Sequence, residues 1–318
     1  MHEHILLGLA TICIVGAGAQ WLGWKIKLPP IIFLLAAGFV IGPITGFLNP
    51  DELFGELLFP IISLAVSVIL FEGGLTLNLK ELKRSGKTIW RLIFGGAVIG
   101  WLMGGYCAYY FLDFPPGLAA LTGAILIITG PTVIAPMLRV IRPSGKIGDV
   151  AKWEGIMNDP IGALIAVLVY EALLLGKIEP SILALELIKT LIQGVVISGV
   201  AAVIIIFLEK KSLIPKYLQN FVILAFVFGT FALSNHFQAE SGLLTVTLLG
   251  IILANQHFFE VSHVIEFKEN LRVLIISGLF VVLAARLEWS SFHSLNLNSF
   301  LFLACLILIV RPAVVFIS

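Results

Sequence analysis

Apolar residues along this chain fall into eleven long runs separated by short polar segments. A helix needs about 20 apolar residues to cross the hydrocarbon core of a bilayer, and most of the runs approach or exceed that length. The pattern therefore predicts an all-α integral membrane domain over residues 1–318, with no soluble domain. The predicted spans are residues 5–24, 29–48, 56–78, 88–112, 117–140, 149–175, 181–208, 218–237, 241–256, 271–287 and 299–318.

Lysine and arginine gather in every second connection between the predicted spans. The alternate connections carry little positive charge, and residues 49–52 and 113–116 are acidic. Because positively charged loops stay in the cytoplasm, this alternation predicts a multi-pass protein with its N-terminus outside. The basic residues are Lys25, Lys27, Lys80, Lys83, Arg84, Lys87, Arg139, Arg142, Lys146, Lys210, Lys211, Lys216, Lys268 and Arg272.

Composition supports a membrane protein. Hydrophobic residues make up 59% of the chain and charged residues 12%, whereas a soluble domain carries about 25% charged residues. The first run reads as a retained helix rather than a cleaved signal peptide. Cys13, Cys107 and Cys305 lie in apolar runs without CxxC spacing, which favours small buried residues over disulfides or metal ligands.

Polar residues outside the spans give weaker indications. Residues 258–272 mix apolar and charged side chains, which predicts an interfacial amphipathic helix between two spans. The six histidines lie near span ends or in loops, where interfacial positions are more common than metal ligation. They are His2, His4, His236, His257, His263 and His293.

Asp159 lies deep inside the sixth predicted span. A carboxylate at the centre of a bilayer costs roughly 2.5–3.5 kcal/mol on insertion scales, so such a residue is a functional candidate by default. Asn158 stands beside it. Gly155 lies one helical turn earlier on the same face, and its missing side chain is expected to let a small ion approach.

Two further carboxylates and an arginine lie within apolar runs. Arg311 cannot lose its charge and needs an acidic partner, and Glu154 is the candidate; the alternative is an anchor at the end of a short helix. Glu72, in Phe71-Glu72-Gly73-Gly74-Leu75, is either functional or a side chain that reaches the membrane surface.

The remaining charges inside the spans have simpler explanations. Arg91 and Lys152 lie near cytoplasmic span ends, from which long side chains can extend into the headgroup region. Glu186 and Lys189 are three residues apart on one predicted helix, which predicts a structural ion pair.

The fifth span contains Thr129-Gly130-Pro131-Thr132 at its middle. Proline removes a backbone donor and clashes with the preceding turn, and glycine adds freedom, so the helix is expected to break here rather than only kink. Unwound backbone is tolerated in a membrane only where protein buries it or where it lines a cavity. Broken helices near the midplane are typical of secondary transporters.

Together these motifs resemble the cation:proton antiporter superfamily in its NhaP-like branch. The resemblance rests on Phe71-Glu72-Gly73-Gly74-Leu75, Thr129-Gly130-Pro131-Thr132, Glu154-Gly155 with Asn158-Asp159-Pro160, Glu240-Ser241-Gly242-Leu243-Leu244 with Gly250-Ile251, and Arg311-Pro312. The motifs occur in order over most of the chain, and the Asn-Asp-Pro motif with glutamate four residues before it is the most specific.

The resemblance implies a fold and residue roles. It implies an inverted-repeat fold of about thirteen helices with two broken helices that cross, a second domain that forms a homodimer, and a prokaryotic plasma membrane location. It expects no cofactor, no metal beyond the transported cation and no nucleic-acid partner. The implied roles are ion and proton binding at Asp159 beside Asn158, cation ligands at Thr129, Thr132 and Glu72, and a structural ion pair of Glu154 with Arg311.

The chain also departs from the resembled pattern. Gly130 stands where many relatives have aspartate, and Gly155 where many have serine, so potassium is considered beside sodium. Two helices of the family pattern, including the second broken one, would follow Arg311, and relatives often continue into a cytoplasmic regulatory domain. The sequence is therefore expected to belong to a longer polypeptide.

The expected activity is electroneutral exchange of Na⁺ or K⁺ for H⁺ by alternating access, with Asp159 holding either the proton or the cation. Asn158 leaves one carboxylate to carry the cycle. The alternatives are a cation channel-like subunit and a sodium-coupled solute symporter of related fold. An enzyme is not expected, because the sequence contains no HExxH motif and no Cys/His cluster.

Overall fold

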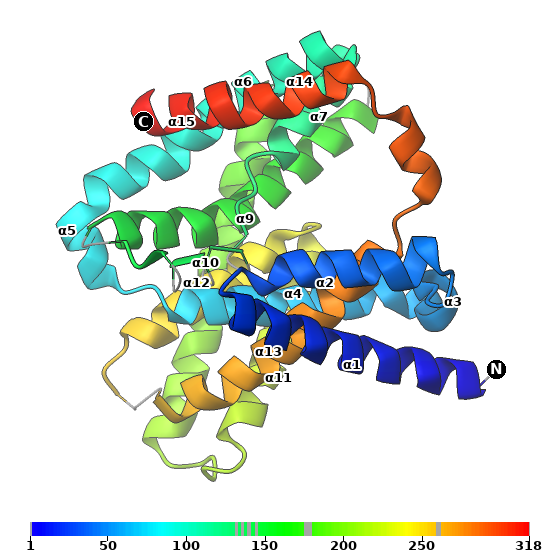
Figure 1. Cartoon of the computed structure of the whole chain (residues 1–318). Helices are drawn as coiled ribbons and strands as arrows, with labels where there is room; N and C mark the ends of the chain where they lie inside the picture. The colour runs from blue at the N-terminus through cyan, green and yellow to red at the C-terminus, as the bar shows by residue number, and fades with distance from the viewer. Residues whose placement is uncertain are drawn as a thin grey trace.

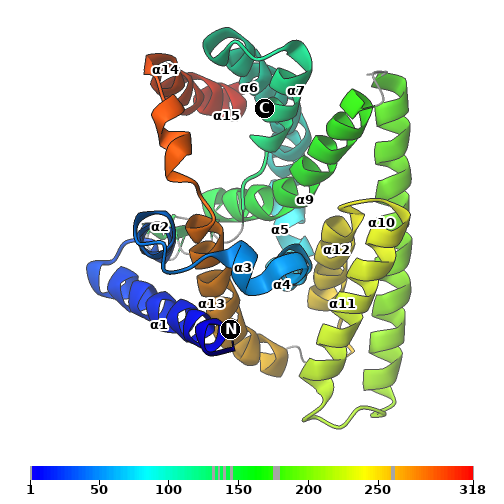
Figure 2. The ribbon, with the colours of Figure 1, turned by 90° about the vertical axis from the view of Figure 1, so that its right-hand side faces the viewer.

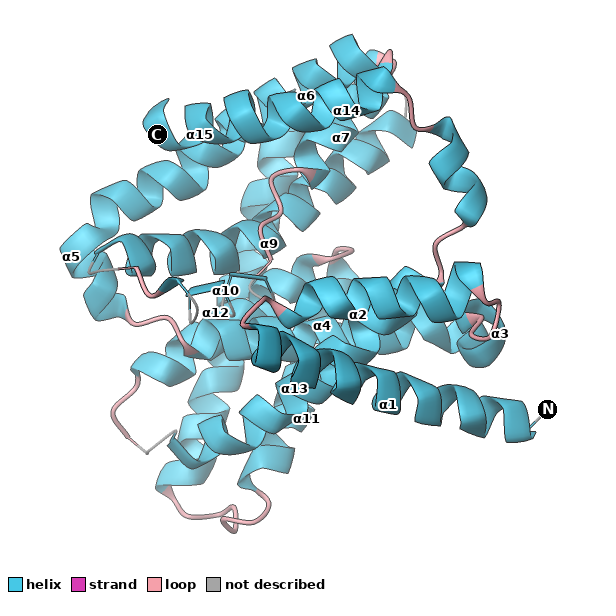
Figure 3. Ribbon diagram, viewed as in Figure 1, coloured by secondary structure: helices cyan, strands magenta, loops and turns pink. Residues whose placement is uncertain are grey.

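The computed structural model describes residues 2–130, 133–134, 137–138, 141–143, 146–174, 180–258 and 262–317. The described part is helical and contains no strand (Figures 1 and 3). Its elements are α1 (His2–Ile26), α2 (Pro30–Phe39), η1 (Val40–Ile44), α3 (Pro50–Phe54), η2 (Gly55–Leu57), α4 (Leu58–Leu75), α5 (Leu79–Trp90), η3 (Arg91–Gly96), α6 (Ala97–Leu112), α7 (Pro116–Ile125), α9 (Lys146–Leu174), α10 (Pro180–Lys210), α11 (Gln219–Phe237), α12 (Ser241–Asn255), α13 (Ser262–Ala285), η4 (Trp289–Ser294), α14 (Leu297–Cys305), η5 (Leu306–Val310) and α15 (Arg311–Ile317).

The apolar helices match the predicted spans in order. Seven helical stretches are long and apolar enough to cross a membrane, and four shorter apolar stretches lie between them. Each falls on one predicted span, so the all-helical, multi-pass prediction is confirmed. The predicted interfacial helix over residues 258–272 is wrong as a separate element, because α13 runs without interruption from Ser262 into the tenth span.

The helices pack as two groups that meet along α9. The upper group in Figure 1 consists of α5, η3, α6, α7, α9, α14, η5 and α15, and the lower group of α1 to α4 and α10 to α13. Figure 2 shows the two groups from the side, where α10 of the lower group extends upward beside α9. Within the upper group α6 packs on α7 and α14, and within the lower group α12 packs on α4, α10 and α11. Helix α9 belongs to the upper group and also contacts α10 and α12.

Two glycines allow α4 and α12 to cross at close range. A β-carbon on Gly74 would overlap the carbonyl oxygen of Thr247, and one on Gly250 would overlap the carbonyl oxygen of Phe71. Small residues let helix backbones approach in membranes, where van der Waals packing replaces the hydrophobic effect. The two glycine motifs thus form one helix crossing, which buries the surrounding side chains Leu70, Phe71, Val246 and Leu249.

A buried polar cluster joins α10, α11 and α12 beside Glu240. The Ser234 hydroxyl lies 2.8 Å from that of Ser241 and 2.7 Å from that of Thr245, and the Gln193 amide donates to the Ser234 carbonyl oxygen at 3.0 Å. Burial raises the pKa of the Glu240 carboxyl, which lies in the α11–α12 connection. Because the buried hydroxyls bond to one another, Ser241 of the Glu240-Ser241-Gly242 motif is explained by helix packing.

Two cysteines from distant parts of the sequence meet in the upper group. The sulfur atoms of Cys107 on α6 and Cys305 on α14 are 3.2 Å apart as free thiols. Cys107 is buried as predicted, Cys305 is only partly buried and Cys13 is exposed, so the prediction that all three are buried is wrong for Cys13 and holds only in part for Cys305. An outward position costs Cys13 little, because this residue behaves as a small hydrophobe on an apolar helix.

The thiol contact gives a direct test of the α6–α14 packing. A disulfide requires the sulfur atoms to close by about 1 Å, so mild oxidation with copper phenanthroline should link Cys107 to Cys305 within one chain. Peptide mass spectrometry before and after reduction measures the link. Cys107→Ala should abolish it and Cys13→Ala should leave it unchanged. A link that forms only between Cys13 and another cysteine would contradict this packing.

Candidate cation site

The predicted helix break lies at the end of α7. The Ile127 amide donates to the Ala124 carbonyl at 3.2 Å and the Ile128 amide to the Ile125 carbonyl at 3.1 Å, which tightens the last turn. Residues 128–130 are not helical, and the amides of Val133 and Ile134 then donate to the Gly130 carbonyl oxygen. The chain is thus unwound at Thr129 and Gly130, as predicted. Pro131 and the predicted cation ligand Thr132 lie outside the described residues.

Helix α9 crosses this break at two glycines. A β-carbon on Gly155 would overlap the side chain of Ile134, and one on Gly162 would lie 2.7 Å from Cγ1 of Ile128. The two glycines are two helical turns apart on one face of α9. The break therefore passes along this face, between the two crossing points that enclose Asn158 and Asp159.

The expected role of Gly155 is wrong. Its missing side chain does not leave room for an ion, because Ile134 from the far side of the break fills that space. The sequence of α9 alone gives no sign of this, since the occupant comes from another element. Gly155 lets the unwound segment pack closely against α9 instead.

Asn158 and Asp159 lack polar partners within the described part of the chain. Asn158 is buried at 3% exposure, its Oδ1 atom accepts no hydrogen bond, and Asp159 beside it is half-buried. A buried polar atom without a partner costs about 1–3 kcal/mol, so such atoms are uncommon away from functional sites. Thr129 is nearby, because its hydroxyl donates to the Glu154 carbonyl oxygen at 3.4 Å, one turn before Asn158.

A cavity of about 310 Å³ reaches Asn158 from the side of α14 and α15. Its walls come from the break, from η3 and α6, and from the C-terminal helices, and most of them are apolar. The lining residues are Gly96, Ala97, Gly100, Leu126, Ile127, Asn158, Leu303, Leu306, Ile307, Val310, Arg311 and Val314. The cavity provides space beside the Asn158 amide.

The structure brings Glu154 and Arg311 together across α9 and α15. Arg311 Nη2 lies 2.8 Å from Glu154 Oε1, and the carboxylate side chain is 9% exposed against 47% for the guanidinium. The unequal burial means that the carboxylate depends on the pair more than the arginine does. The Glu186–Lys189 pair predicted on α10 is also present, at 2.6 Å.

Glu72 pairs with a residue that the sequence analysis did not select. Arg272 on α13 places Nη1 3.0 Å from Glu72 Oε1, and both side chains are largely buried. A cation at Glu72 would have to compete with this guanidinium, which weakens the predicted role of Glu72 as a cation ligand. The sequence does contain a signal for this pair, because Arg272 stands at the start of an apolar run. An arginine buried there needs a carboxylate as its partner.

Comparisons with known proteins agree with this fold. The family model "Sodium/hydrogen exchanger, transmembrane" matches residues 8–318. The Na(+)/H(+) antiporter 1 of Methanocaldococcus jannaschii is 26% identical, over 98% of this chain and 75% of that protein. The K(+)/H(+) antiporter NhaP of Alkalimonas amylolytica is 24% identical, over 98% of this chain and 54% of that protein. The solved structure of the sodium proton antiporter MjNhaP1 from Methanocaldococcus jannaschii superposes with a TM-score of 0.82 at 23% identity, covering 99% of this chain and 78% of that one.

The unequal burial of Glu154 and Arg311 predicts unequal costs of breaking their pair. Arg311→Met leaves a buried carboxylate without its partner and should destabilise the protein by roughly 3–5 kcal/mol, as in soluble precedents. Glu154→Gln leaves a half-exposed arginine, which can turn away, and should cost less. Thermal unfolding of the purified variants measures both effects. Recovery in the charge-swapped double variant would support the pair, and wild-type melting of Arg311→Met would contradict it.

Proposed function

The chain belongs to the sodium/hydrogen exchanger transmembrane family, and from this we propose that it exchanges a monovalent cation, Na⁺ or K⁺, for H⁺ at Asp159. The family consists of transporters rather than enzymes and needs no cofactor. The observation that carries the assignment of the site is the position of Asp159 and Asn158, without polar partners among the described residues, on the face of α9 that meets the helix break.

The proposed chemistry is competition for one carboxylate. Asp159 binds either a proton or a cation, so occupation by one disfavours the other and couples their movements in opposite directions. Oxygen atoms for the cation would come from the Asn158 amide and from Thr129 and the backbone freed at the break, as in other broken-helix transporters. The buried Asn158 Oδ1, which accepts no hydrogen bond in the described structure, supports this role.

Alternating access would arise from movement of the two helix groups around this site. The break, α9 and Arg311 all belong to the upper group, so the ligands can move together while the lower group gates access. The placement of basic residues in alternate loops supports an N-terminus outside a plasma membrane. We further propose a homodimer, following the family resemblance.

Both sodium and potassium are retained as substrates in the proposal. Gly130 and Gly155 provide no side-chain oxygen where many relatives have aspartate and serine. With fewer fixed side-chain ligands, backbone oxygens and water would complete the coordination. A relative named as a Na(+)/H(+) antiporter and one named as a K(+)/H(+) antiporter match this chain at similar identity.

Asp159→Asn should abolish coupled exchange and leave folded protein in the membrane, because the amide cannot release a proton. Proton flux measured with a pH-sensitive dye in proteoliposomes, with sodium, potassium and lithium compared, tests this. The matched control is Asp113→Asn, an exposed aspartate in a loop, which should exchange at the normal rate. Wild-type cation-driven proton flux in Asp159→Asn would reject the site. Cation current without proton coupling in the unmodified protein would indicate a channel.

Exchange should be electroneutral, because Asn158 remains uncharged and only Asp159 alternates between proton and cation. Movement of one net charge would be worth about 2.3 kcal/mol per 100 mV, so an electrogenic cycle would respond strongly to voltage. The rate of exchange in proteoliposomes should therefore stay nearly constant when a membrane potential is imposed. A clear acceleration by the potential would show that a second proton carrier takes part.

A further inference from the structure

The turn between α4 and α5 connects the two helix groups by the shortest described route. Helix α4 of the lower group ends at Leu75 and α5 of the upper group begins at Leu79. Thr76, Leu77 and Asn78 make the connection, and the Asn78 side chain caps α5 by accepting a hydrogen bond from the Lys80 amide at 2.9 Å. The other described connection between the groups, residues 286–296 from α13 to α14, is longer. Residues 76–79 are called the pivot turn below.

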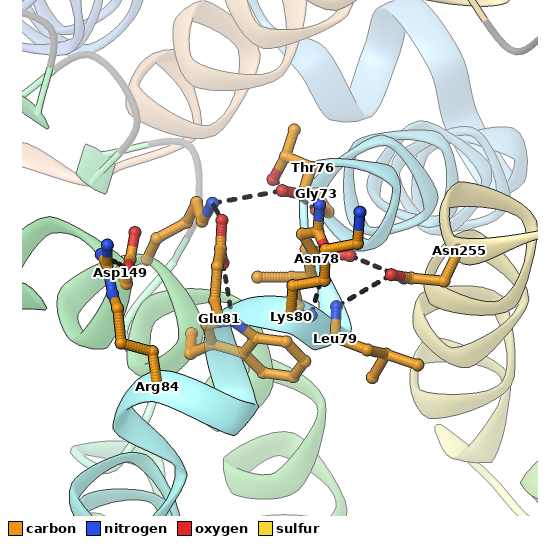
Figure 4. Close-up of polar contacts among 12 residues, drawn as sticks. Gly73, Thr76, Asn78, Leu79, Lys80, Glu81, Arg84, Asp149 and Asn255 are labelled. Carbon is orange, nitrogen blue, oxygen red and sulfur yellow. Dashed lines mark hydrogen bonds and ion pairs between the residues drawn. The ribbon is translucent and has the colours of Figure 1, made fainter.

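The lower group holds the pivot turn through Asn255, at the end of α12. The Asn255 amide nitrogen donates to the Leu77 carbonyl oxygen at 2.9 Å, and its Oδ1 atom accepts from the Leu79 amide at 2.8 Å. Figure 4 shows Asn255 reaching from α12 to this turn. The same amide nitrogen also donates to the Ile251 carbonyl at 2.8 Å, which fixes the side chain to its own helix. One side chain thus replaces the helical hydrogen bonds that the turn lacks.

The upper group holds the same turn through Lys152, near the start of α9. Its ammonium group donates to the Thr76 carbonyl oxygen at 3.2 Å and to Glu81 Oε1 at 2.6 Å. The indole of Trp153 donates to the other oxygen of Glu81 at 2.9 Å. Lys152, whose side chain the sequence analysis expects to extend into the headgroup region, thus makes defined contacts with the turn and with α5. An ion pair between Arg84 and Asp149 adds a second link between α5 and α9.

The side chain of Leu77 anchors the turn from inside. It is fully buried, at 0% exposure, in a cluster that contains Trp153 and Met157 of α9, Ile89 of α5 and Ile251 of α12. The cluster therefore includes residues of both helix groups. A buried leucine resists displacement, because exposing its side chain would cost about 1.5–3 kcal/mol. The turn is short, held by hydrogen bonds on two sides and fixed by a buried side chain.

We propose that the pivot turn is the point about which the two helix groups rotate during transport, and that Asn255 and Lys152 are the positioning residues that fix it. Two rigid bodies joined by a short, fixed connection cannot separate there, so their relative movement must be small at the connection and larger at the opposite end. This proposal rests on the proposed exchange function and adds where its conformational change is centred.

The pivot lies close to the proposed cation site along α9. Lys152 and Asp159 are seven positions apart, which is about 10 Å at 1.5 Å per residue. The carboxylate would therefore move less than the ends of α6 and α7, which are farther from the turn. Access would change mainly because the opposite ends of the groups open and close.

Asn255→Ala should slow exchange without weakening cation binding. The variant loses both hydrogen bonds to the pivot turn but touches neither Asp159 nor the break, so the exchange rate per folded molecule should fall by about tenfold. Cation affinity is measured as the cation concentration that gives half of the maximal rise in melting temperature. This concentration should be the same in the variant as in the unmodified protein. The matched control is Asn49→Ala, which removes an asparagine cap of α3 within the lower group and should keep the normal rate.

A normal exchange rate per folded molecule in Asn255→Ala would overturn the proposal, as would a rate loss matched by an equal loss of cation affinity. Absence of exchange in the unmodified protein would instead overturn the proposed function.

Spin-label distances give an independent readout of the movement. The pivot pair, Lys83→Cys with His257→Cys, lies beside the pivot turn with one label on each group. The distal pair, Leu118→Cys with Glu56→Cys, lies at the opposite end with one label on each group. All four positions are exposed. Labels are placed in a background without the native cysteines, and distances are compared between low and high pH with saturating cation. The distal distance should change by several times more than the pivot distance. An equal or larger change at the pivot pair would overturn the proposal.

Discussion

Hydrocarbon does not solvate charge or unpaired backbone, and this constraint accounts for the arrangement of the polar groups in the structure. Each described buried charge on the helices around the site has a partner from another helix, as with Glu154 and Arg311 or Glu72 and Arg272. The unwound residues after α7 are covered by α9, whose glycines let them approach. Asp159 and Asn158 lie where α9 meets the break and have no polar partner among the described residues, and we propose that a cation and a proton compete there.

Two ion pairs with a buried carboxylate lie one in each helix group. Glu154 and Arg311 join helices of the upper group, and Glu72 and Arg272 join helices of the lower group. Neither pair crosses the boundary between the groups, so relative rotation of the groups would break neither of them. The contacts that do cross the boundary are concentrated at the pivot turn and along α9. This distribution is suited to two bodies that move while each stays intact.

Sequence patterns predicted features that depend on one element and one ion pair between elements, Glu154 with Arg311, but missed the other contacts between elements. Span positions follow from hydrophobicity, the break at Gly130 from proline chemistry, and the partner of Arg311 from the need to neutralise an arginine. Arg272 was grouped with the loop charges, since only the packing of α13 against α4 shows which way it faces. Ile134 against Gly155 and Cys107 against Cys305 join positions whose proximity no spacing rule encodes.

The cavity beside Asn158 has a consequence for ion hydration. Its volume of about 310 Å³ is about ten times the roughly 30 Å³ that one water molecule occupies in the liquid. An ion that reached Asn158 through this space could keep part of its water shell, and the mostly apolar walls would offer few oxygens to replace it. A partly hydrated ion is sensed by its charge more than by its radius, because water molecules adjust to either size. A site that receives partly hydrated ions would discriminate weakly between sodium and potassium. The ion that is more abundant in the surroundings would occupy it.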